Sequence, residues 1–483
     1  MQGIGIIVSL VLARFLMPSD YGLVAMATGF TGVLAMVSGL GLSDAAVQAK
    51  ELGHEQASAL FWLNAGLGLV MGLGCVAAGP FLGEYFREPT VPLVTAWAGL
   101  ALFLNVLALQ HRVQVTRAGR YGALAMADLV TQLGAGVAAI GMAALGYGWK
   151  ALVGLFMIQA AARLGTSWWV AGWVPGWPRL RDVPIPTIRL GLVVCLGWIM
   201  SSLSAAAESA ALGRVAGPGG LGLYTKAQQL ARYPVMIFFV PAFLPAVHRL
   251  GKHQGDTGAL SREYLRLQLW VMLLASLPIG VLAGIAPDFV PAVMGSQWSA
   301  SVPLFLVLLV GTLAHPMAHG AMWALTARAR KREMVFFQLW SGFIPIAAIV
   351  TGALLAGPAG ACAGAAASMW FALVPAGALL ARRAAALDIP SYATAMLRVV
   401  TVALACAAAG WLGRAGFGWL GVGHAGLRAL LGALVGCIAW LAAARALSRA
   451  VLREVLETIA ATLRVGEVRW VRGLIDTCVP GEA

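Results

Sequence analysis

The sequence predicts an all-α polytopic membrane protein of about 14 transmembrane helices, with two parallel six-helix lobes followed by two C-terminal helices. Three observations predict it. Of the 483 residues, 60% are hydrophobic and 11% are charged, whereas soluble domains carry about 25% charged residues. Long apolar stretches nearly fill the chain, and a twelve-residue pattern near the start returns two hundred residues later.

Fourteen apolar stretches are long enough to cross the hydrocarbon core, which takes about 20 residues of helix. They cover residues 2–17, 21–42, 57–82, 90–110, 121–146, 151–174, 188–212, 222–247, 264–287, 301–325, 334–356, 359–381, 392–412 and 425–447. The connections between them are short. We therefore expect no large extramembrane domain and no long outer loop that could hold an enzyme's active site.

Lys and Arg are distributed unequally between the two sets of loops. The loops after even-numbered stretches hold 18 of them, and the odd-numbered loops with their margins hold 7. Cytoplasmic loops carry the excess of Lys and Arg, so the even-numbered loops are expected in the cytoplasm. Because the number of spans is even, both termini are expected there as well. The net charge of +14 is thus attributed to topology, and nucleic acid is not an expected partner.

An internal repeat supports the two-lobe arrangement. LARFLMPSDYGL (12–23) and LGRVAGPGGLGL (212–223) share Leu, Arg, Pro, Gly and Leu without a gap. The copies lie six stretches apart, an even number, so they have the same orientation, as in a parallel repeat about an axis along the membrane normal. TVPL (90–93) and SVPL (301–304) open the fourth helix of each half.

The repeat divides the chain into four parts. They are an N-lobe (1–176), a C-lobe (187–383), two further helices (390–448) and a cytoplasmic amphipathic tail (449–483). The tail is expected to lie on the inner leaflet, with a solvated helix as the alternative. The seventh stretch begins about thirteen residues earlier than the matching first one, so the first helix is expected to be shortened, a native half-helix being the alternative.

Several segments carry a family resemblance. LARFLMPSDYGLVAMATGF (12–30), SGLGLSDAAVQAK (38–50), SALFWLNAGLGL (58–69), HRVQVTRAGRYGALAMADLV (111–130) and ALGRVAGPGGLGLYTKAQQLARYPV (211–235) resemble bacterial Wzx/WzxC-type polysaccharide exporters of the multidrug/oligosaccharidyl-lipid/polysaccharide superfamily. The resemblance implies a flippase of undecaprenyl-diphosphate-linked oligosaccharides in the bacterial inner membrane, acting in exopolysaccharide or lipopolysaccharide biosynthesis. Glu208 departs from the family motif, which commonly has Asp at that position.

Few ionisable residues lie deep in the apolar stretches, where a charge costs at least about 2.5–3.5 kcal/mol unless it is paired or functional. They are Asp128, Arg163, Glu208, Lys226 and Arg232. Asp128 and Glu208 are candidates for a coupling ion or for ion pairs. Arg163 is expected to line a cavity and face lipid phosphate, with pairing to Asp128 as the alternative.

The eighth stretch has one polar, cationic face. Thr225, Lys226, Arg232 and Tyr233 fall within about 60° of Gln229 on a helical wheel, and small residues occupy the opposite side. Arg offers paired hydrogen bonds to phosphate oxygens and Lys adds a point charge, so this face predicts an anionic ligand such as a diphosphate. In the alternative, Lys226 snorkels to the outer interface and Arg232 pairs with Glu208.

Two other features predict no cofactor. His315 and His319 are spaced for a metal but flank Pro316 and lack a nearby third ligand, so packing is expected. No GxxxxGK[ST] sequence is present, so an ion gradient or the membrane potential, and not bound ATP, is expected to supply energy. The many glycines predict close helix packing.

Three functions remain open. The first is a lipid-linked oligosaccharide flippase working by alternating access, with membrane lipids and other polysaccharide assembly proteins as further partners. The alternatives are a cation-coupled multidrug exporter of the same superfamily and a polysaccharide polymerase or ligase. The deep charges are mainly basic and the outer loops are short, which favours the flippase, a transporter and not an enzyme.

Overall fold

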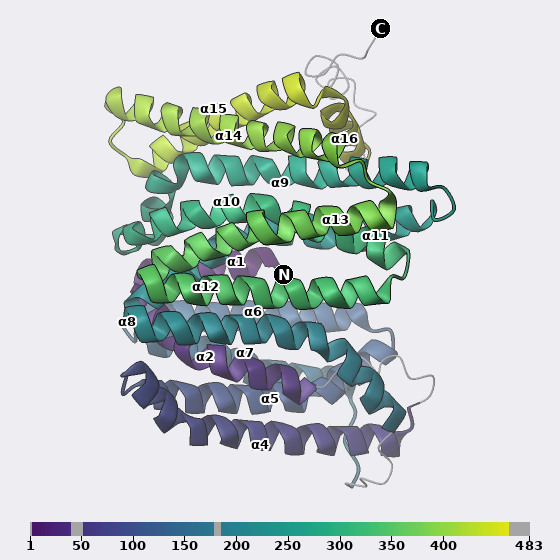
Figure 1. The fold of residues 1–483 in the computed structure, drawn as a ribbon. Coiled ribbons are helices and arrows are strands. Elements are labelled where there is room, and N and C mark those ends of the chain that lie inside the picture. The colour runs from purple at the N-terminus through teal and green to yellow at the C-terminus, as the bar shows by residue number, and fades with distance from the viewer. Residues whose placement is uncertain (1, 40–51, 178–184, 463–483) are drawn as a thin grey trace. The chain divides into compact units, whose positions relative to one another are not determined.

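A computed structural model describes residues 2–39, 52–177 and 185–462, which form helices joined by short connections without a strand (Figure 1). The longer helices are α1 (Gln2–Phe15), α2 (Pro18–Gly39), α4 (His54–Phe86), α5 (Val91–Arg117), α6 (Tyr121–Ala144), α7 (Trp149–Ala171), α8 (Ile185–Gly251), α9 (Thr257–Met294), α10 (Val302–His319), α12 (Lys331–Ala367), α13 (Val374–Ala385), α14 (Ile389–Trp419), α15 (Ala425–Leu447) and α16 (Arg449–Thr462). Shorter pieces are η2 (Ser296–Ser301), α11 (Ala321–Ala327) and the π-helical turn η3 (Ser368–Leu373).

The predicted all-α polytopic class is confirmed. In the described part of the chain, nine helices are long and apolar enough to cross a membrane. Two of them are kinked pairs that correspond to two predicted stretches each. α8 breaks at Gly217, whose φ is 64°, and α12 breaks at Ala356 and Gly357. α1, α2 and α7 coincide with the three remaining predicted stretches.

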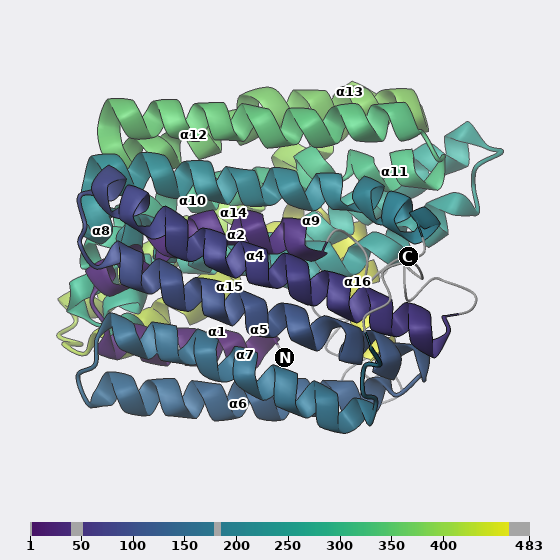
Figure 2. The same cartoon turned by 90° about the horizontal axis from the view of Figure 1, so that it is seen from below.

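The chain divides into two compact units. The first unit comprises Met1–Thr225 and Ile349–Ala361, and the second comprises Lys226–Ala348 and Cys362–Ala483. In the first unit, α5 packs against α2, α4 and α7, and α6 packs against α1 and α7. Figure 2 shows α4, α5, α7 and α6 running side by side. The predicted four-part division is based on the repeat and stays a prediction.

The two copies of the repeat touch each other inside the first unit. A Cβ atom on Gly22 of α2 would lie 1.7 Å from the carbonyl oxygen of Pro218, and one on Gly222 of α8 would lie 1.8 Å from that of Pro18. The contact is reciprocal, as it is when two equivalent surfaces meet about a two-fold axis. The shared Pro opens a helix in both copies, and the shared Gly lets the two backbones approach.

Glycines also join the helices of the second unit. Here α9 packs against α10, α14 and α15 (Figure 1). A Cβ atom on Gly280 or Gly284 of α9 would lie 2.8 or 2.7 Å from a carbonyl oxygen of α14. Small residues that allow such close approach are typical of helix packing in membranes. The predicted role of glycine in helix packing is therefore confirmed at these positions.

Helix α9 starts at a capped position outside the apolar run. The Asp256 carboxylate accepts hydrogen bonds from the backbone N–H groups of Gly258 and Ala259 at 2.8 and 3.0 Å. These bonds lower the pKa of Asp256, because they stabilise its charged form. The cap satisfies backbone donors that the first helical turn leaves without partners.

The described part of the predicted tail is α16, which packs on the second unit. Leu452 and Val455 are buried, and Leu452 joins an apolar cluster with Leu273 and Trp440. The Trp270 indole donates to Glu454 at 2.9 Å. The predicted amphipathic face is thus used, at least in part, against other helices. Its position on the inner leaflet stays a prediction, and residues 463–483 lie outside the described part.

Candidate functional site

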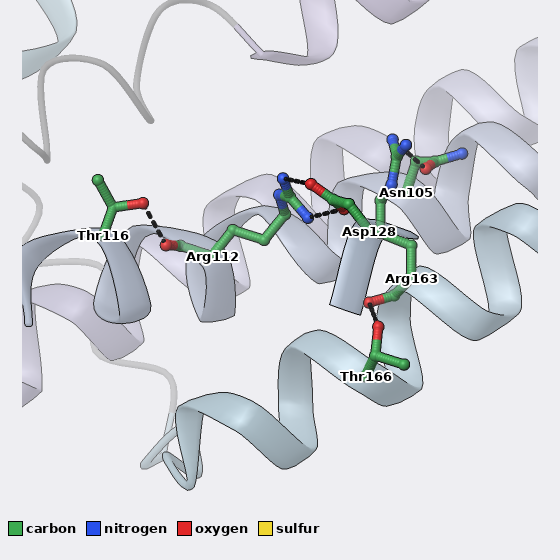
Figure 3. A network of polar contacts seen from close by, with 6 residues as sticks. All are labelled: Asn105, Arg112, Thr116, Asp128, Arg163 and Thr166. Atoms are coloured by element: carbon green, nitrogen blue, oxygen red, sulfur yellow. Dashed lines mark hydrogen bonds and ion pairs between the residues drawn. The ribbon is translucent and has the colours of Figure 1, made fainter. Parts of the chain in front are cut away.

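Asp128 of α6 is bound by an arginine that follows the predicted fourth stretch. Arg112 of α5 donates to both carboxylate oxygens, at 2.7 and 2.9 Å (Figure 3). The two side chains are 25% and 22% exposed. A bidentate pair of this kind is among the stronger polar interactions in proteins. Asp128 is therefore an ion-pair partner of Arg112, where the alternative from sequence was Arg163.

Arg163 of α7 lies beside this pair without joining it (Figure 3). Its guanidinium donates to the neutral Asn105 side chain at 3.3 Å. Among the described side chains, no carboxylate lies within ion-pair distance of Arg163, and its side chain is exposed. Because Asp128 and Arg112 compensate each other, Arg163 adds a net positive charge to an apolar helix. Such a group can receive an anion.

Arg232, in the second half of α8, is also exposed. Within the second unit, no carboxylate of the described residues lies within ion-pair distance of Arg232. Glu208 belongs to the first unit, so its pairing with Arg232 stays an untested alternative. Arg232 is close enough to His315 of α10 to influence it electrostatically. Arg163 belongs to the first unit and Arg232 to the second, so each unit carries one of these two candidate arginines.

The remaining residues of the polar face on α8 have different environments. The Lys226 ammonium donates to Gln229 at 3.1 Å, and the residue is 1% exposed. A lysine that snorkels keeps its charged end in water, which differs from this burial. Gln229 and Tyr233 are half-buried, while Ala227 and Ala231 on the opposite side are buried. The helical wheel placed Lys226 and Arg232 on the same face as Gln229 and Tyr233. Of the two cations, Arg232 is exposed and Lys226 is buried.

Glu208 lies in the first half of α8 and is 9% exposed. Its carboxylate accepts hydrogen bonds from Ser204 at 3.1 Å and from Tyr224 at 3.3 Å. Tyr224 directly follows the second copy of the repeat, which ends at Leu223. The carboxylate thus links the two sides of the break at Gly217. A buried acid with hydroxyl donors could carry a proton or bind a cation, as well as hold the helices together.

The two histidines of α10 pack as a pair. The rings of His315 and His319 stack with centroids 4.2 Å apart, and Phe239 and Phe337 contact them edge-on. This is the predicted packing of histidines on a helix that contains Pro316. In the part of the chain that the structure describes, no cluster of three potential metal ligands occurs.

Sequence reasoning missed two groups of residues. Asn105 and Arg112, which surround Arg163, were overlooked because Arg112 counted only as a loop charge. Asp288 was overlooked because the predicted ninth stretch ends at residue 287, whereas α9 continues to Met294. Its partners, Arg414 and Arg428, are 126 and 140 residues away. A carboxylate flanked by Pro287 and Pro291 inside an apolar helix was the available signal.

The helical arrangement matches that of solved polytopic membrane proteins. A solved structure of the lipid II flippase MurJ in an inward closed conformation matches 93% of this chain and 97% of its own length, with a TM-score of 0.72 and 10% identity. An inward-facing multidrug resistance transporter of the MATE family, in the MOP superfamily, matches 83% and 95%, with a TM-score of 0.60 and 15% identity. At these identities the likeness shows the fold alone.

Sequence comparison gives the family. The polysaccharide biosynthesis protein family matches residues 11–303, more than half of the chain, and the chain belongs to this family. Lipopolysaccharide biosynthesis protein WzxC of Escherichia coli strain K12 is 25% identical over 75% of this chain and 74% of its own. Teichuronic acid biosynthesis protein TuaB of Bacillus subtilis strain 168 is 23% identical over 66% and 68%, respectively. The predicted resemblance to Wzx-type exporters is confirmed.

Proposed function

We propose that the chain is a flippase that moves undecaprenyl-diphosphate-linked oligosaccharide units across the bacterial inner membrane for polysaccharide biosynthesis. The family and the transporter fold support it. One observation of the structure favours an anionic ligand: Arg163 lies in an apolar helix, bonded to a neutral amide, while the nearest acid is occupied by Arg112. A transporter of diphosphate lipids needs such a cation, whereas an exporter of cationic drugs needs free carboxylates.

In this proposal, Arg163 and Arg232 bind the diphosphate, and Lys226, Gln229 and Tyr233 add polar contacts on the α8 side. Asp128 and Glu208 stabilise the surrounding helices, and Glu208 is the candidate for a coupling ion. Transport proceeds by alternating access. No bond is made or broken in the substrate, so the chain is a transporter and not an enzyme. Other polysaccharide assembly proteins would supply and use the lipid-linked unit.

Removal of the protein from its native host tests this function directly. Lipid-linked oligosaccharide units should accumulate on the inner leaflet, protected in intact cells from a membrane-impermeant oxidant of sugars. They should become accessible to the oxidant again when the chain is re-expressed. Accumulation of single units on the outer leaflet would instead indicate a polymerase or ligase, and unchanged units with altered drug resistance would indicate a drug exporter.

The orientation gives a separate prediction. We propose that both termini face the cytoplasm. A cytoplasmic reporter should be active when fused after Arg330, between α11 and α12, or after Arg383 in the last turn of α13. A periplasmic reporter should be active after Ser296, where η2 begins, or Gly357, where α12 breaks. A consistent reversal at all four positions would overturn the orientation.

A further inference from the structure

Three side chains from distant parts of the chain meet at one end of the second unit. Asp288 of α9 accepts hydrogen bonds from Arg428 of α15 at 2.9 Å and from Arg414 of α14 at 3.2 Å. The side chains are 7%, 29% and 18% exposed, respectively. Because α14 and α15 are joined by the short turn at the left of Figure 1, this end lies opposite to α16.

The cluster has more positive charge and more donors than its carboxylate uses. Two guanidinium groups face one acid, which leaves a net charge of +1. Each guanidinium has five N–H donors. The Nε atoms of Arg414 and Arg428 are both buried and have no hydrogen-bond partner among the described residues. A buried donor without a partner is destabilising, so an added acceptor would stabilise this arrangement.

The two arginines line an open pocket. Its volume is about 430 Å³, and its lining consists of Arg414, Ala415, Gly418, Trp419 and Arg428. This volume falls within the range of small-ligand sites, about 300–1,000 Å³. Gly418 lies next to Arg428, because a Cβ atom there would be in van der Waals contact with the Arg428 side chain at 3.6 Å. The pocket can therefore hold a group of the size of a phosphate ester.

The residues around the pocket are suited to contact with a lipid. Trp419 at its rim is 94% exposed, and tryptophan is enriched at the membrane interface. A stripe of exposed apolar side chains runs from the pocket along α15. It consists of Leu427, Leu430, Leu434 and Ile438. The charge pattern predicts that this end is periplasmic, where only 7 Lys and Arg were counted, and two of them meet here.

We propose that Arg414 and Arg428 bind the phosphate headgroup of an anionic glycerophospholipid, whose acyl chains lie along the apolar stripe of α15. A phosphodiester carries one negative charge and matches the net charge of +1. A diphosphate lipid carries at least two, and the excess would face Asp288 without compensation. The arginine fork suits the two free oxygens of a phosphodiester. The site is independent of the ligand that the lobes transport.

Native mass spectrometry of the purified full chain with phosphatidylglycerol tests the proposal. Arg428→Gln and Arg414→Gln should each weaken binding by about tenfold, as expected for a lost charge-assisted hydrogen bond. Asp288→Asn should strengthen it, because the competing carboxylate charge is removed. Arg445→Gln is the matched control, since Arg445 is exposed near the opposite end of α15, and should leave binding unchanged.

A second variant keeps all three charges. Gly418→Leu fills the pocket from its wall and should lower phosphatidylglycerol binding, even if an arginine variant fails to fold. The site would be overturned if Gly418→Leu and at least one of the two arginine variants, each tested alone, bound phosphatidylglycerol with wild-type affinity. Equal binding of phosphatidylcholine would overturn the role of charge. Tighter binding of undecaprenyl diphosphate at the same arginines would overturn the assignment to a glycerophospholipid.

Discussion

Gly22→Ala is expected to remove most of the yield of folded protein, because the alanine Cβ atom would lie 1.7 Å from the Pro218 carbonyl oxygen. Overpacking costs about 1–3 kcal/mol where side chains can rearrange. Here the obstacle is backbone at the start of a helix, so we expect a loss at or above the upper end of that range. The yield of monodisperse protein and its thermal denaturation in detergent measure the effect.

The repeat makes the same prediction for Gly222, whose Cβ atom would lie 1.8 Å from the Pro18 carbonyl oxygen. Gly222→Ala should therefore match Gly22→Ala in direction and size. Gly32→Ala in α2 and Gly219→Ala in α8 are the controls, since a Cβ atom at either meets nothing within 4 Å. Normal stability of both contact variants, or a loss in the controls as large as theirs, would contradict the close reciprocal contact.

Apolar length predicted the helices well, because crossing a bilayer sets a narrow range of lengths. It also separated the two halves of α8 and of α12, since each is too long to be one span. The way in which the halves join could not be predicted. α8 continues through Gly217 and α12 through Gly357 with a single local break, which depends on φ values that the sequence does not specify.

Polar partners were harder to predict than helices. A helical wheel places Lys226 and Arg232 on one face, but the neighbouring helices decide that one is buried and the other exposed. The bond between Arg112 and Asp128 depends on the relative rotation and height of α5 and α6. Rotation and tilt are set by packing against neighbours, so the pattern of one helix cannot supply them.

Loss of Arg163 is the second large effect that we expect. Arg163→Ala should lower transport of the lipid-linked unit about 10- to 150-fold, the factor that corresponds to a charged hydrogen bond of about 1.5–3 kcal/mol. Arg163→Lys should recover only part of this activity, because lysine lacks the planar fork. Polymer export normalised to the amount of protein in the membrane is the measurement. Lys150→Ala, at an exposed position near the start of α7, should export normally.

Arg232→Ala should give a loss of similar size, because this arginine is the exposed cation on the polar face of α8 in the second unit. Asp128→Asn separates transport from stability. Its carboxylate is held by Arg112, so this change should lower thermal stability, as expected when one partner of an ion pair is left alone. If Arg163→Ala instead lowered stability as Asp128→Asn does, with normal export per folded molecule, Arg163 would be structural. Normal export by both Arg163→Ala and Arg232→Ala would contradict the proposal that these arginines bind the diphosphate.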